Sequence, residues 1–137
     1  MLFGSSILHV GQYMIDLRKL NEIADTCADG FRIRSFDGSR MTMVGSFDHC
    51  YYHNVEVVFI EVAYCSCPTD MMDVKFRMAD RAERKRMKEL LDMDEDDQVY
   101  CIEADAGVGD KTFMIVAIDA TMREELVKYH EPNKVLQ

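Results

Sequence analysis

The sequence predicts an α+β protein, with one domain over residues 1–137 built mainly on an antiparallel β-sheet of five to seven strands and about three helices packed on it. Three observations support this prediction. Several segments alternate apolar and polar residues, short turn sequences join neighbouring segments, and other segments repeat apolar residues every three or four positions. Because strands joined by short turns pair antiparallel, an antiparallel sheet follows.

Seven segments have the composition of β-strands. Residues 31–34 and 41–44 alternate apolar and polar side chains, and the tight-turn sequence Asp37-Gly38 between them predicts a hairpin. Residues 51–65 are rich in Val, Ile, Phe and Tyr on both faces, which predicts a central strand covered on two sides. The other segments predicted as strands are residues 7–14, 74–78, 98–104 and 112–118.

Three segments have the pattern of α-helices. Residues 16–28 carry one apolar stripe behind a capping aspartate. Residues 80–91 and 121–129 each begin with a capping box, in which the first side chain and a glutamate three residues later bond the free amides of the first turn. We therefore expect helices at the start, in the middle and at the end of the chain.

The chain is acidic, with a formal net charge of −9. Acidic and basic side chains balance over residues 1–88, so residues 89–137 carry the whole net charge. Negative charge repels phosphate backbones, which disfavours nucleic acid and favours a basic protein partner. No apolar run approaches the roughly 20 residues that span a bilayer, and the first residues lack a secretory pattern, so we expect a cytoplasmic protein without a membrane partner.

Five cysteines, an odd number without a secretion signal, predict reduced thiols. Cys65 and Cys67 have a Cys-x-Cys spacing, and Cys50 lies between His49 and His53, so thiolates and imidazoles could bind a transition metal if a turn brought them together. One of these thiols could instead act as a nucleophile beside a histidine. The alternative is that the cysteines pack in the core and the histidines lie at the surface.

The candidate catalytic residues are His49, His53, Glu56 and Cys65, which could line a pocket between the sheet and the helices. Glu56 lies in an otherwise apolar strand, where burial could raise the pKa of its carboxyl and suit it to acid–base chemistry. The alternative for such a glutamate is a position at a strand edge or on a solvated face.

Acidic residues at Asp92, Asp94 and Asp96 precede Glu103 in a segment of twelve residues. With acids at positions 1, 3, 5 and 12, this segment resembles the calcium-binding loop of EF-hand proteins, and the resemblance implies a divalent cation as ligand. It departs from the pattern at position 6, where Asp97 replaces glycine, and the segment that follows is predicted as strand instead of helix. The alternative is a solvated acidic loop, and no other cofactor is predicted.

Basic residues gather between Lys75 and Lys88, around the start of the middle helix. Such a run could contact nucleic acid, but the acidic chain and the acidic loop that follows favour a solvated helix face. A basic helix next to an acidic loop could also support self-association between complementary charges.

The sequence contains no glycine-rich phosphate loop, no GxSxG elbow, no HExxH motif and no dinucleotide fingerprint. We therefore expect a small acidic binding protein without catalysis, similar in size and composition to inhibitor, antitoxin and immunity proteins. A sheet with two apolar faces favours a homodimer, because each face needs cover. The alternative function is a small enzyme or ligand-binding domain that uses the four candidate residues named above.

Overall fold

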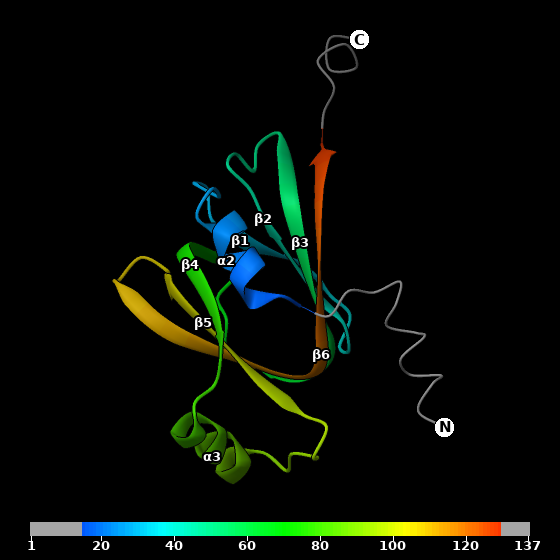
Figure 1. Cartoon of the computed structure of the whole chain (residues 1–137), viewed down its shortest axis with the longest axis vertical. Helices are drawn as coiled ribbons and strands as arrows, with labels where there is room; N and C mark the ends of the chain where they lie inside the picture. Colours follow the sequence, from blue (N-terminus) through cyan, green and yellow to red (C-terminus); the bar gives the residue numbers. More distant parts are fainter. Residues whose placement is uncertain (1–14, 130–137) are drawn as a thin grey trace.

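Six antiparallel strands close into a barrel in the computed structural model, which describes residues 15–129 (Figure 1). Around the barrel the strands follow the order β1-β2-β3-β6-β5-β4. Their bounds are β1 Phe31–Phe36, β2 Met41–Gly45, β3 Tyr52–Cys65, β4 Asp70–Met78, β5 Gln98–Asp105 and β6 Asp110–Lys128. The α+β class and the antiparallel sheet are confirmed, and the sheet curls on itself instead of lying open.

The barrel interior explains why residues 51–65 looked apolar on both faces. Val55, Val57 and Phe59 alternate along β3 and are fully buried in the main core, while Val58 and Ile60, at the alternate positions, are half-buried on the outer side. Closing the sheet gives the inner face its cover within one chain. Cover by a second subunit is therefore not needed for this face.

Two helices lie in the described residues, α2 (Leu17–Ala24) and α3 (Arg81–Leu90), instead of the three that were predicted. In α2, the carboxylate of Asp16 caps the first turn by accepting a hydrogen bond from Lys19 N at 3.1 Å. Leu20 and Ile23 of α2 pack into the same core as the barrel interior. Neither helix is long and apolar enough to cross a bilayer.

The barrel is closed between β1 and β4 by two ladder pairs, Phe31 with Met71 and Arg32 with Asp70, and by a hydrogen bond from Ile33 N to Thr69 O at 3.0 Å just before β4. Helix α2 lies beside β4 and supports this seam (Figure 1). The amide side chain of Asn21 donates to Phe76 O and accepts from Phe76 N, both at 2.8 Å. A side chain thus satisfies strand backbone groups at a place where β1 does not reach.

Helix α3 lies outside the barrel and packs on β5 and β6 through a second, smaller apolar cluster (Figure 1). The buried members of this cluster are Met87, Val99, Cys101, Met114 and Val116. The predicted capping box of α3 is confirmed, because Asp80 accepts from Glu83 N at 2.8 Å and Glu83 accepts from Asp80 N at 2.9 Å.

The prediction of a final helix over residues 121–129 was wrong. Residues up to Lys128 belong to β6, where Thr121 pairs with Val58 and Met122 pairs with Val57. The long ladder with β3 uses the backbone groups that a helix would need, so the local capping signal is overridden. The strand predicted over residues 7–14 lies outside the described residues.

Candidate functional site

One polar cluster joins His53, Glu56 and Tyr129. His53 is only 1% exposed, and its two ring nitrogens contact Tyr129 Oη at 2.7 Å and Glu56 Oε2 at 2.8 Å. Arg123 lies 3.7 Å from the other oxygen of Glu56. The guanidinium of Arg34 stacks 5.5 Å above the Tyr129 ring, and burial raises the pKa of the Tyr129 hydroxyl.

These contacts assign the direction of each hydrogen bond. A carboxylate can only accept, so His53 Nε2 carries a proton and donates to Glu56. In the neutral imidazole Nδ1 then accepts from the Tyr129 hydroxyl. Because both nitrogens are used within the protein, His53 has no ring nitrogen left for a substrate, and the cluster ties the end of β6 to β3.

His49 occupies a separate place, in the connection between β2 and β3. Its Nε2 lies 2.9 Å from Gly30 O, so Nε2 is the protonated nitrogen, and its backbone N–H donates to Asp29 at 2.8 Å. Burial lowers the pKa of the His49 imidazole, which favours the neutral ring. Among residues 15–129, His49 Nδ1 has no hydrogen-bond partner.

Cys65, the fourth candidate, lies at the far end of β3 from His53, at its last residue. Its Sγ accepts from Cys67 N at 3.4 Å, and the two thiols are hydrogen-bonded to each other. The bond from the Cys67 thiol, together with that from Cys67 N–H, lowers the pKa of the Cys65 thiol to about 6. The shared bond and burial raise the pKa of Cys67. The structure thus joins His53 with Glu56 and places Cys65 elsewhere.

The residues of the predicted calcium loop do not come together. Asp92, Asp94 and Asp96 are exposed in the connection between α3 and β5, while Glu103 lies well inside β5 and accepts from Arg77 Nε at 3.0 Å. Asp97 accepts from Asp94 N at 2.9 Å and so shapes the turn. Within the described part of the chain, no three His, Cys, Asp or Glu side chains are grouped as metal ligands.

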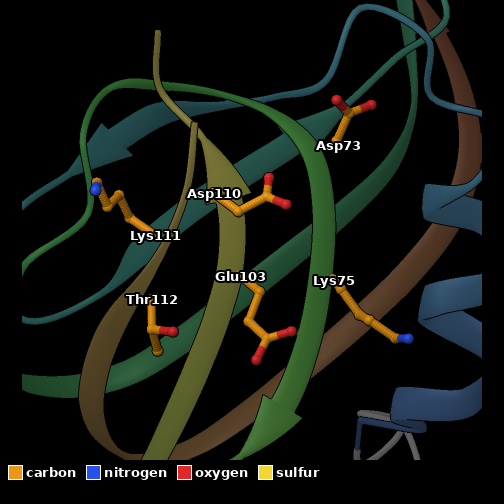
Figure 2. A pocket seen from close by; sticks show the side chains of 6 residues that line it. All are labelled: Asp73, Lys75, Glu103, Asp110, Lys111 and Thr112. Carbon is orange, nitrogen blue, oxygen red and sulfur yellow. The ribbon is translucent and has the colours of Figure 1, made fainter. Parts of the chain in front are cut away.

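An open hollow of about 590 Å³ lies at the other end of β4 and β5 (Figure 2). Figure 2 shows carboxylates of Asp73, Glu103 and Asp110 on neighbouring strands, with Lys111 pointing away from them. Lys75 and Thr112 complete its lining. Charges of both signs line this hollow, and its side chains are solvated, so it has the character of polar surface.

The buried carboxylate of Glu83 anchors α3 to the barrel. Arg77 of β4 donates two hydrogen bonds to it, at 2.7 Å and 2.8 Å, and a third to Glu103. The contact with Arg77 is the main cause that lowers the pKa of the Glu83 carboxyl to about 2. Glu83 therefore stays ionised in the folded protein at any ordinary pH.

This anchor predicts acid sensitivity. The pKa of Glu83 is depressed from 4.5 to about 2 on folding, so the unfolded chain binds the proton more readily. The stabilisation is complete above about pH 4.5 and is lost as the pH falls toward about 2. In urea unfolding between about pH 3 and about pH 7, we expect Glu83→Gln to show a shallower pH dependence than the unmodified protein. Glu89→Gln, at an exposed position of the same helix, should keep the original dependence; an equal change in both variants would contradict the assignment.

The outer side of α3 presents an unpaired basic surface, formed by Arg81, Arg84, Lys85 and Lys88 around a shallow hollow of about 510 Å³. Three of these side chains are exposed and Arg84 is half-buried. Within residues 15–129, none of the four forms an ion pair. We call this set the basic face, and the exposed residues Asp92, Asp94, Glu95 and Asp96 that follow α3 the acidic loop.

Comparison of the chain with protein-family models, with curated proteins and with solved structures found no match. The functional inference therefore depends on the chemistry of these residues.

Sequence reasoning missed two side-chain pairs of the fold, one of which involves a candidate residue. Tyr129 was assigned to a helix, so its contact with His53 was not foreseen, and no local signal marks it. The basic residue Arg77 was predicted as part of a solvated run, whereas it pairs with the buried Glu83. The sequence signal that could have indicated this pair is an arginine six positions before a capping-box glutamate.

Proposed function

We propose that this chain is a non-catalytic interaction protein that associates through the charged end formed by the basic face of α3 and the acidic loop. The observation that supports it most is that these two sets of opposite charge are exposed, adjacent in the chain and, among the described residues, without ion-pair partners. Unpaired, solvated charges of this kind are available to a partner at little desolvation cost.

The partner that fits this end best is a second copy of the chain. In a two-fold dimer each surface meets the same surface of the other copy, so a basic set next to an acidic set is self-complementary. The basic face of one copy would then lie against the acidic loop of the other. This arrangement gives the expected homodimer a basis in charge, in place of the two apolar sheet faces.

Pairing of two copies would leave the acidic character of the assembly in place. The basic face and the acidic loop carry four charges each, of opposite sign, so each chain keeps its net charge of −9 outside the contact. Such a surface attracts a basic protein. A basic partner, in the manner of inhibitor and immunity proteins, is thus part of the same proposal.

The arrangement of the candidate catalytic residues favours a non-catalytic function. His53, Glu56 and Tyr129 bond to one another, and the barrel interior is filled by apolar side chains such as Phe59. Cys65 and His49 do not join that cluster. A binding role needs only the exposed charges.

The test is the oligomeric state of the full chain, measured by light scattering and sedimentation at low and high salt. We expect a dimer that weakens as salt rises. Arg84→Glu with Lys85→Glu should weaken it by at least about tenfold, because like charges then oppose each other. Asp94→Lys with Glu95→Lys should weaken the dimer to a similar extent. All four changes together should restore it, because opposite charges then face each other again.

Lys111→Glu, in the distant hollow of Figure 2, serves as the control for net charge and should leave the dimer unchanged. A chain that stays monomeric at high concentration in low salt would overturn the proposed dimer, as would a four-residue charge swap that fails to restore association.

A further inference from the structure

We propose that Cys65, Cys67 and Met41 form a binding site for one soft monovalent metal ion, Cu(I), at the end of β3. The observation that supports it is a group of three sulfur atoms, one from β2, one from β3 and one from the connection after β3. The Cys65 thiol donates to Met41 Sδ at 3.8 Å and is also hydrogen-bonded to the Cys67 thiol. This site is separate from the charged end, and its existence does not depend on the proposed dimer.

The course of β3 explains how the sulfurs meet. Glu61 has a left-handed backbone conformation with φ of +53°, and the register with β6 shifts between Val62 and Tyr64. Val62 N at this bend donates to Ser39 O at 2.7 Å, in the turn just before β2. The bend therefore brings the last part of β3 next to the start of β2, where Met41 lies.

The backbone after β3 holds the second thiol in place. Ser66 N donates to Met114 O at 2.9 Å, and the Ser66 hydroxyl accepts from Met114 N at 2.8 Å. Cys67 N donates to Cys65 Sγ, and Pro68 follows with its fixed backbone angle. The backbone that carries both thiols is thus held by the fold before any ion binds, which lowers the entropy cost of binding.

The sulfur spacing suits a shared ion. Sulfur ligands lie about 2.3 Å from a bound metal, so two ligands of one ion at trigonal or tetrahedral angles are about 3.8–4.0 Å apart. The separation of 3.8 Å between Cys65 Sγ and Met41 Sδ falls in this range. Met41 is only 1% exposed, whereas Cys65 and Cys67 are half-buried and pack against the core that contains Met41.

The donor set selects the class of metal. Thiolate and thioether sulfurs are soft ligands, and a thioether favours Cu(I) over Zn²⁺ or harder ions. Among residues 15–129, no third cysteine, histidine or carboxylate groups with these two thiols as a metal-ligand set. A three-sulfur site of this kind matches the low coordination number that Cu(I) accepts.

Cu(I) binding displaces protons from the thiols. The ion forms bonds to both cysteine sulfurs and to the thioether, and the protons that the thiols carry are released to solvent. Neither the protein nor the ion changes oxidation state, and affinity should rise with pH.

The test titrates the reduced full-length protein with Cu(I) under anaerobic conditions against a coloured Cu(I) chelator. We expect one ion per chain, with only sulfur neighbours in the copper X-ray absorption spectrum. Cys65→Ser and Cys67→Ser should each weaken binding on the order of 100-fold or more, since each removes a direct ligand. Cys50→Ser, which removes the exposed cysteine, is the matched control and should bind as the original chain does.

The variant Met41→Leu distinguishes a site with three sulfur ligands from a site made of the two thiols alone. This change nearly conserves volume and should keep the barrel folded, as circular dichroism will check. We expect it to weaken Cu(I) binding about tenfold while thiol reactivity is kept. Unchanged affinity in Met41→Leu, or equal affinity in Cys65→Ser and the original chain, would overturn the proposal. Dimerisation measured on the same samples reports separately on the charged end.

Discussion

Replacing Gly30 with alanine is expected to destabilise the folded state by about 2–5 kcal/mol. Gly30 precedes β1 with φ of +74°, a conformation that costs an L-residue about 1–2 kcal/mol. A Cβ there would also come within 2.0 Å of the backbone oxygen of Met71 in β4. Because strand backbone cannot yield as a side-chain tip does, we add about 1–3 kcal/mol for the forced shift.

The matched control for this prediction is Gly38→Ala. Gly38 has φ of +92°, but an added Cβ would meet nothing within 4 Å, so only the conformational cost remains. Urea unfolding of both variants, followed by circular dichroism, gives the two losses directly. Equal losses would show that the approach to Met71 carries no cost of its own.

Replacing Arg77 with methionine is expected to cost about 3 kcal/mol. The change removes the donors that neutralise Glu83, and a buried carboxylate without its partner is strongly destabilising. This value is the lower end of the cost of removing one partner from a buried ion pair. The Arg77 side chain is 33% exposed, so solvent can partly replace its contacts with Glu83. Chemical unfolding at neutral pH measures the loss.

Two further variants show whether the loss of stability in Arg77→Met comes from the unpaired carboxylate of Glu83. Arg86→Met removes an exposed cation of α3 and should change stability by no more than about 0.5 kcal/mol. Arg77→Met combined with Glu83→Gln should be more stable than Arg77→Met alone, because no charge is then left buried. If the double variant were the less stable one, the explanation by an uncompensated carboxylate would be wrong.

The sequence predicted best those elements whose signals act over a few residues. Asp37 accepts hydrogen bonds from the N–H groups of Ser39 and Arg40, which is the tight turn expected from Asp37-Gly38. The same holds for the cap formed by Asp80 on α3. In each case both partners lie within one turn of chain, so the residues present are enough to define the structure.

Long-range pairing explains what the sequence did not reveal. Barrel closure depends on β1 meeting β4, about forty positions later, and alternation of side chains says nothing about which strands become neighbours. The prediction of a final helix over residues 121–129 was wrong for the same reason, because these residues pair with β3. Local propensity is overridden where a distant strand supplies a full ladder.

The same contrast between local signals and long-range pairing applies to the candidate site. His53 was selected as a possible metal ligand or base near Cys50, and Glu56 as a carboxylate in an apolar strand. Three positions along an ideal strand place side chains on opposite faces. A register shift in the β3–β6 ladder between His53 and Val55 accompanies their contact. Tyr129 comes from the other end of the sequence, so only the fold could bring it to His53.

The short pairing between β1 and β4 determines where local opening of the barrel should begin. Two ladder pairs and one further hydrogen bond hold this seam, whereas the β3–β6 ladder runs the full length of β3, so fluctuations that open the barrel should begin at the seam. Opening would expose two strand edges that could recruit other chains. Arg32 and Asp70, which form an ion pair at 2.8 Å on those edges, place charges there that discourage aggregation.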